Sequence, residues 1–157
     1  MNDKICYFYI RPNGSRPDYR LFMAFLWHEG QDIDSDGDPY NPASKEWTCL
    51  FLCNRENKAE RVMISPIIRD GTFKEPLILE VKSECDYLAV RCAYFLAITT
   101  DSGVSEARNE TPSEPSALVE RMGAGFDVEA ALRRVENSPF SRSTLENPYP
   151  NLSSTNA

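Results

Sequence analysis

Residues 77–99, LILEVKSECDYLAVRCAYFLAIT, decide the fold of this chain. The first five residues predict a short strand at 77–81, and the remainder predicts a helix at 84–99 that is apolar on nearly every side. Ser83 with Asp86 three residues later resembles a capping box, and alanines at 89, 93 and 97 form one stripe on a helix. The larger apolar residues also alternate as in a strand, but alanine favours helices and is depleted in strands. We therefore interpret 84–99 as a helix, and since it lacks a polar face, we expect a sheet to bury it.

Four other segments are predicted to join 77–81 in an antiparallel sheet, namely residues 4–11, 19–29, 46–54 and 61–66. The segment 19–29 is ambiguous, because Pro17 and Gly30 at its ends suit a helix, whereas the run LFMAFLW suits a strand buried on both faces. The turn signal Asn13-Gly14 would make residues 4–29 a hairpin, so we interpret 19–29 as a strand.

The predicted fold class is α+β, with an antiparallel sheet of four to five strands packed against the buried helix 84–99. Two short C-terminal helices follow, near 115–121 and 128–136, the second capped by Asp127. Residues 1–138 are expected to form a single globular domain. Pro, Ser, Asn and Thr dominate residues 139–157, which predicts an extended or disordered C-terminal tail.

Composition narrows the classes of function. The formal net charge is −7 and no Lys/Arg cluster is present, which argues against nucleic acid as a partner. The longest apolar run is too short to span a bilayer, and no secretory signal pattern is seen, so we expect no membrane association and a cytoplasmic location. The five cysteines are not spaced as a local metal chelate, and we interpret them as small buried residues.

The polar segment 31–45 is predicted to be a long loop, and its most suggestive motif is Asp32-x-Asp34-x-Asp36-Gly37. Three alternating carboxylates with a glycine in sixth place are typical of the start of a calcium loop. Position twelve, however, is Ala43 where a bidentate Glu is needed, so Asp32, Asp34 and Asp36 are weak metal candidates. The alternatives are a solvated acidic loop, or a loop that presents carboxylates to a basic partner.

No other pattern specifies chemistry. His28 is the sole histidine, which excludes sites built from several histidines, and no nucleophile has a supporting local motif. No phosphate loop or dinucleotide fingerprint is present, so no cofactor is expected. Tyr40 and Trp47 follow the aspartate segment, and an exposed aromatic there would suit a protein interface.

These observations favour a non-catalytic acidic binding protein that occupies the basic or active surface of a partner protein. A bacterial toxin-neutralising, immunity-type inhibitor fits this size and charge. The expected partner-binding residues are His28, Glu29, Asp32, Asp34, Asp36, Asp38, Tyr40 and Trp47. Two alternatives remain open: a docking subunit that uses the C-terminal helices and tail, and a small enzyme with a scattered site around His28 and aspartates 32–38.

Overall fold

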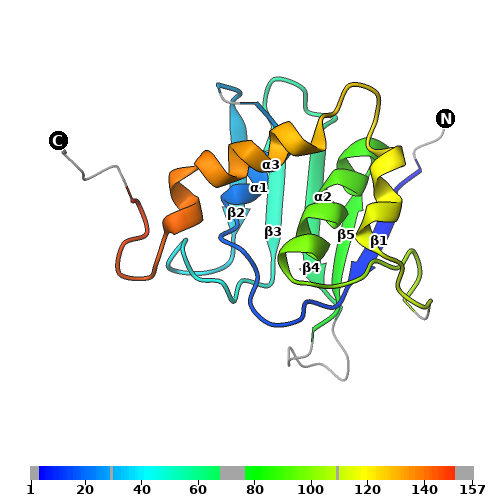
Figure 1. The fold of residues 1–157 in the computed structure, drawn as a ribbon, viewed down its shortest axis with the longest axis horizontal. Coiled ribbons are helices and arrows are strands. Elements are labelled where there is room, and N and C mark those ends of the chain that lie inside the picture. The colour runs from blue at the N-terminus through cyan, green and yellow to red at the C-terminus, as the bar shows by residue number, and fades with distance from the viewer. Residues whose placement is uncertain (1–3, 29, 68–76, 109, 151–157) are drawn as a thin grey trace.

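The computed structural model describes residues 4–28, 30–67, 77–108 and 110–150, and it arranges them as one sheet covered on one face by helices (Figure 1). The strands are β1 (Cys6–Ile10), β2 (Ile33–Gly37), β3 (Leu50–Asn54), β4 (Arg61–Pro66) and β5 (Leu79–Ser83). The helices are α1 (Leu21–Leu26), α2 (Asp86–Thr99) and α3 (Val128–Asn137), with 3-10 helices η1 (Pro115–Arg121) and η2 (Pro139–Arg142).

All neighbouring strands are antiparallel, in the order β1-β5-β4-β3-β2. Strands β2 to β5 follow one another as a meander, and β1 adds to the far edge beside β5. The chain from β1 to β2, which includes α1, therefore crosses the whole sheet on the helical side. This five-stranded antiparallel sheet with helices confirms the α+β fold class.

The predicted strand at 19–29 is wrong, because residues 21–26 form α1, and the predicted hairpin 4–29 is wrong with it. The buried residues of α1 are Leu21, Phe22, Phe25 and Leu26, which is the spacing of one helix face. Met23 and Ala24, on the other side, are also apolar. This hides the helical period in the sequence, so the run resembles a doubly buried strand.

The sheet takes its fifth strand from the segment that was predicted as a long loop. Residues 33–37, IDSDG, have poor strand propensity but pair with β3 over their whole length, from Ile33 opposite Asn54 to Gly37 opposite Leu50. Gly37 lies close to Tyr19, and a Cβ atom at this position would lie 3.0 Å from the Tyr19 ring. The other predicted strands exist with shifted bounds, since β3 begins at Leu50 and β5 covers Leu79–Ser83.

Helix α2 lies at the centre of the helical layer, in contact with β1, β4, β5, α1 and η1. Ala89, Ala93 and Ala97 are all fully buried, as the stripe predicted. The helix begins two residues later than predicted, with Cys85 at the N-cap position. The hydroxyl of Ser83 accepts a hydrogen bond from the Cys85 N–H at 2.9 Å and donates one to the Arg61 carbonyl, so it joins the helix start to β4 and does not form the expected capping box.

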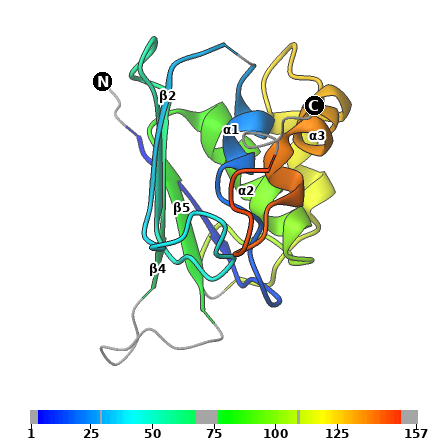
Figure 2. The same cartoon turned by 90° about the vertical axis from the view of Figure 1, so that its left-hand side faces the viewer.

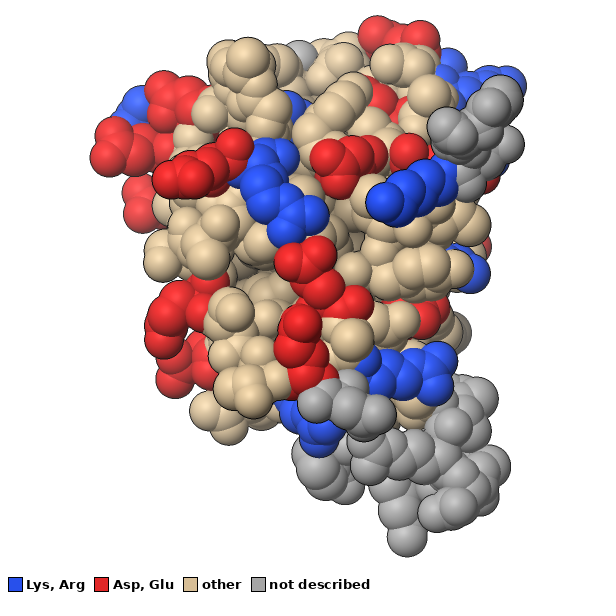
Figure 3. All heavy atoms as spheres, turned by 90° about the vertical axis from the view of Figure 1, so that its right-hand side faces the viewer, with Lys and Arg blue, Asp and Glu red and all other residues tan. Residues whose placement is uncertain are grey.

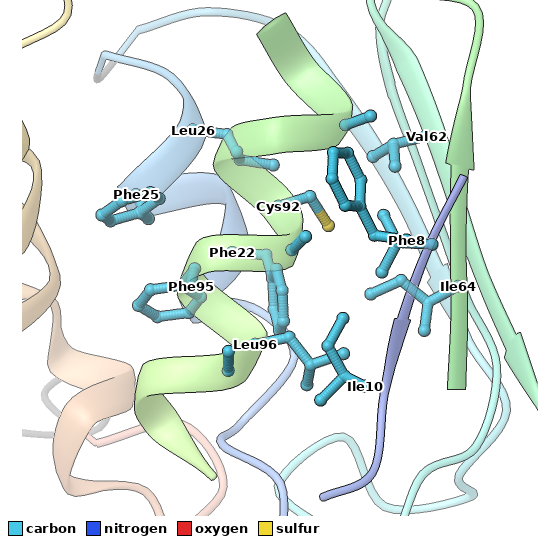
Figure 4. Packing of buried hydrophobic residues seen from close by; sticks show 14 of the residues in the cluster. Phe8, Ile10, Phe22, Phe25, Leu26, Val62, Ile64, Cys92, Phe95 and Leu96 are labelled. Carbon is cyan, nitrogen blue, oxygen red and sulfur yellow. The ribbon is translucent and has the colours of Figure 1, made fainter. Parts of the chain in front are cut away.

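The core lies between the sheet and the helices (Figure 4). Phe8 and Ile10 from β1, and Val62 and Ile64 from β4, face Cys92 and Leu96 of α2. Aromatic rings join the helices to each other. The Phe95 ring meets Phe22 edge-on at 4.9 Å and stacks with Phe25 at 4.7 Å, both distances between ring centroids.

The C-terminal segment after α3 packs on the domain over the part that is described. Helix η2 places Phe140 against the Arg20 guanidinium, 3.9 Å from the ring centroid. The Ser143 hydroxyl is buried and donates a 2.6 Å hydrogen bond to Asp18, which also forms a buried ion pair with Arg20. Within the expected tail, Phe140 and Ser143 thus contact the domain, most residues from 144 to 149 are exposed, and residues 151–157 lie outside the described residues.

Replacement of Phe22 tests whether α1 belongs to the core. Phe22→Ala should lower the free energy of unfolding by about 3–5 kcal/mol, because it leaves a cavity between Trp47 and Phe95. Met23→Ala, on the half-buried side of the same helix, should cost clearly less. Urea unfolding followed by fluorescence measures both, and equal losses would contradict the orientation of α1.

Replacement of Ser143 tests the packing of the C-terminal segment. Ser143→Ala should cost about 1–3 kcal/mol of unfolding free energy, because the buried Asp18 carboxylate loses a donor. Ser141→Ala, two residues earlier and exposed, should change it by less than about 0.5 kcal/mol. Thermal unfolding of the two variants in parallel decides the point, and an unchanged Tm for Ser143→Ala would show that the segment is not held there.

Candidate protein-binding surface

The structure brings three of the predicted partner-binding residues together on the edge strand β2. Asp34 and Asp36 lie opposite Cys53 and Phe51 and point to the sheet face away from the helices, and Asp32 precedes them in the same alternation. We call Asp32, Asp34 and Asp36 the acidic ridge. A strand separates alternate residues by about 6.6–6.8 Å along its axis, whereas a calcium loop wraps its ligands around one point. Within the described residues no group of three or more His, Cys, Asp or Glu is placed to hold a metal ion.

One basic side chain partly neutralises the ridge. Arg55 contacts Asp32 at 3.0 Å and Asp34 at 3.4 Å, and all three side chains are about half exposed. Ion pairs this exposed contribute little to stability and exchange readily with other partners. Asp36 is exposed and has no ion pair within the described part of the chain. The ridge thus keeps carboxylates available to a cation from outside.

Asp38 has a structural role that the sequence did not indicate. Its carboxylate accepts hydrogen bonds from the Thr48 N–H at 2.9 Å, the Thr48 hydroxyl at 2.7 Å and the Cys49 N–H at 3.1 Å. Burial alone would raise the pKa of Asp38, but these hydrogen bonds outweigh it and lower the pKa below its ordinary value. Asp38 therefore closes the loop between β2 and β3 and is separate from the acidic ridge.

The two predicted interface aromatics differ in exposure. Tyr40, in the loop after β2, is fully exposed and close in sequence to the ridge. Trp47 is 1% exposed, meets Phe22 edge-on, and donates its indole N–H to the Pro17 carbonyl at 2.7 Å. Tyr40 is thus available to a partner, whereas Trp47 is a core residue.

His28 and the aspartates do not form one site. His28 is exposed and lines two pockets of about 310 and 260 Å³ with Trp27, Gln31 and Arg134, and neither pocket includes any of aspartates 32–38. Its backbone N–H donates to the Gln31 side chain at 3.2 Å. Glu29, also predicted, lies outside the described residues.

The outer face of the sheet, opposite the helices (Figure 2), carries exposed apolar side chains among charged ones and was not predicted from the sequence. Strand register places one residue from each strand in a row across it: Asp36, Phe51, Met63, Lys82 and Tyr7. Tyr7 and Met63 are 41% and 38% exposed. Shallow hollows of about 240 and 210 Å³ lie on either side of Met63, and the second reaches Asp36. The sequence contained a signal for these exposed apolar side chains. Strand β1 has apolar residues on both of its faces, which is unusual in a sheet that helices cover on one face.

Charged side chains also gather at the other end of the molecule. Figure 3 views the end near β1 and η1, where both acidic and basic side chains are exposed and several acidic side chains adjoin one another. The ion pair between Arg121 and Glu106, 3.0 Å apart, is part of this mixed surface. The acidic ridge lies at the β2 edge, at the opposite end of the sheet from β1.

A polar cluster around Glu60 was also not predicted. The Glu60 carboxylate accepts hydrogen bonds from the Trp27 indole at 2.8 Å, the Asn54 amide at 3.1 Å and the Tyr87 hydroxyl. It borders the 310 Å³ pocket together with Arg91. Burial would raise the pKa of Glu60, but these hydrogen bonds and the nearby Arg91 lower it overall, while the hydrogen bond to Glu60 raises the pKa of Tyr87. The cluster joins the β3–β4 turn to α1 and α2, and its donors come from three separate elements.

Comparison with protein-family models, with curated proteins and with solved structures finds no match to this chain. In addition, no helix within the described ranges is long and apolar enough to cross a lipid bilayer. The candidate surface is therefore defined by its own geometry: the acidic ridge, Tyr40 nearby in sequence, and the row that runs from Asp36 across Phe51 and Met63 to Lys82 and Tyr7 on the outer face.

The depressed pKa of Glu60 predicts acid sensitivity. A carboxylate whose folded pKa lies below its unfolded value contributes stability at pH values above the unfolded pKa, near 4.5, and this contribution is lost as the pH falls through the folded pKa. Unfolding free energy should therefore decline below about pH 4.5. Glu60→Gln should be less stable at neutral pH and show a shallower decline in acid, as measured by urea unfolding between pH 3 and 7.

Glu56 provides the matched control, because it is exposed and belongs to the same β3–β4 turn. Glu56→Gln should leave both the neutral stability and the acid slope nearly unchanged. If Glu60→Gln retained the slope of the unmodified chain, the Glu60 cluster would not be a source of the acid sensitivity.

Proposed function

We propose that this chain is a non-catalytic binding protein that occupies a basic surface of a partner protein through its acidic ridge and the outer face of its sheet. The observation that carries the proposal is the alignment of Asp32, Asp34 and Asp36 on one open edge, next to the partly exposed apolar side chains of Phe51 and Met63. Protein interfaces combine an apolar centre with a polar rim, and opposite charges speed encounter and fix orientation.

Each part of this surface has a distinct role in the proposed complex. Phe51 and Met63 provide the apolar centre, flanked by hollows into which partner side chains could fit. Asp36 adjoins that centre and is free of internal ion pairs among the described residues, so it would pair with a partner Lys or Arg without first losing an existing contact. Tyr40 provides an exposed aromatic of the kind that is enriched at binding hot spots.

The narrower form of the proposal is a bacterial toxin-neutralising, immunity-type inhibitor, in which the covered surface contains the partner's active site. It is supported by the net charge of −7 together with the acidic ridge. This form predicts that the partner is an enzyme, and that one equivalent of the chain abolishes the partner's activity.

Charge reversal on the ridge tests the binding proposal. The double variant Asp34→Lys, Asp36→Lys should lose the partner that the unmodified chain captures from a lysate of the source cells, because it repels a basic surface. Each exchange adds two positive charges, so the net charge changes from −7 to −3. Affinity purification with mass spectrometry measures the loss, and capture should also weaken at high salt.

The matched control is Glu120→Lys, Glu136→Lys, which carries the same net charge but alters exposed residues of η1 and α3 in the helical layer. It should retain the partner. Equal loss in both variants would show that total charge and not the ridge governs the interaction, and equal capture would show that the ridge does not contribute to it. Either result would contradict the proposal.

A further inference from the structure

The two edges of the sheet differ in how their backbone groups are satisfied. At the β1 edge the Tyr9 N–H donates to the Ser105 carbonyl at 2.8 Å, and the Tyr9 carbonyl accepts from the Ser105 N–H at 3.0 Å, so the segment after α2 covers that edge. At the β2 edge no other described segment passes in front of the strand (Figure 2). The β2 edge is therefore the accessible one.

The register shows which backbone groups of β2 point outward. The Asp32 carbonyl accepts from the Arg55 N–H at 2.9 Å, and the Asp38 N–H donates to the Cys49 carbonyl at 3.3 Å. Residues at alternate positions of an antiparallel strand bond to the same neighbour, so Asp34 and Asp36 also bond to β3. The N–H and C=O groups of Ile33, Ser35 and Gly37 consequently face away from the sheet, and the described residues supply no backbone partner for them.

We propose that β2 binds an extended segment of the partner protein as a sixth strand. This inference rests on the proposed function and specifies how the acidic ridge recognises its partner. An open edge with alternating unpaired donors and acceptors is the template for such strand addition. Main-chain hydrogen bonds from Ile33, Ser35 and Gly37 hold the segment, and the side chains of β2 select its sequence.

Side-chain chemistry on the two faces of β2 defines that sequence. On the outer face the added strand lies beside Asp34 and Asp36, where opposite charges on neighbouring strands attract, so Lys or Arg fits. On the inner face it lies beside Ile33, next to a hollow of about 260 Å³ lined also by Met23 and Phe140, where an apolar side chain fits. The partner segment thus alternates basic and apolar residues.

A second copy of this chain does not fit the same edge. Antiparallel pairing of two β2 strands centred on Ser35 would place Asp34 of each copy opposite Asp36 of the other. Like charges at directly opposed positions are destabilising. The occupant is therefore a different, basic chain.

The probe is a capped seven-residue peptide that alternates lysine and valine, added to the ¹⁵N-labelled full chain at low salt. In the free protein the amides of Ser35 and Gly37 should exchange with solvent much faster than those of Asp34 and Asp36. With the lysine peptide bound, exchange at Ser35 and Gly37 should slow at least about tenfold, since these amides acquire acceptors. A peptide with glutamate in place of lysine should give no protection.

Ser35→Pro provides a second test, because it removes one outward N–H and leaves the hydrogen bonds to β3 in place. It should weaken binding of the lysine peptide about fivefold or more, whereas Ser35→Ala should bind as the unmodified chain does. If Ser35→Pro does not fold, amide exchange in the unmodified chain decides alone.

Three outcomes would overturn strand addition. One is slow exchange at Ser35 and Gly37 in the free protein, and another is protection by both peptides alike. The third is a lysine peptide that shifts the resonances of Asp34 and Asp36 without protecting Ser35 and Gly37. In that last case side-chain recognition by the ridge, and with it the proposed function, would remain. The proposed function itself is tested separately, by partner capture with the charge-reversal variants.

Discussion

The burial of helix α2 is the constraint from which the rest of the architecture follows. Leu88, Ala93 and Leu96 are fully inaccessible to solvent, and apolar residues occupy nearly the whole circumference of the helix. Such a helix needs cover on every side, and the sheet, α1 and η1 provide it. Its one mid-helix charge, Arg91, is accommodated by stacking on Tyr87 and Phe126 and by donating to the Met122 carbonyl at 2.8 Å.

This arrangement also determines where the sheet is open. All the helices lie on one face, so the side chains on the other face have no cover from the described chain. The crossover from β1 to β2 carries α1 over the helical side and leaves β2 at the far edge. Residues 33–37, an acidic segment with poor strand propensity, form the edge strand because they pair with β3. The backbone N–H and C=O groups on the other side of β2 are left exposed.

Residues 77–99 were predictable because their local pattern and their final environment agree. Where the two disagree, sequence reasoning failed. The apolar run at 21–27 fits a buried strand or a buried helix equally well, and its packing against α2, α3 and Trp47 accommodates it as a helix. The segment 33–37 contains two aspartates and a glycine and predicts a loop, but pairing with β3 overrides this weak preference. The order of strands depends on contacts between distant segments, which no local pattern records.

In the candidate site, too, the local sequence pattern and the folded environment differ. Asp32, Asp34 and Asp36 lie on one side of the chain because residues 33–37 are extended, and the sequence, which predicts a loop here, did not indicate this. Nothing in the alternation of aspartates distinguishes Asp38, which turns back onto Thr48, or Trp47, which is buried against Phe22. Both lie within reach of the ridge in sequence, and only the folded loop between β2 and β3 separates them from it.

The acidic ridge reconciles two demands on an open edge strand. An uncovered strand tends to pair with its own copies, and charged residues on its faces are a known protection against this. Here the protecting residues are all of one sign, so the protection is selective: it opposes an acidic or identical strand and favours a basic one. Lysines at positions 34 and 36 would protect the edge equally well but select an acidic partner. In the proposed complex, the sign of the charge on β2 selects the partner strand, and the outward backbone groups of β2 bind it.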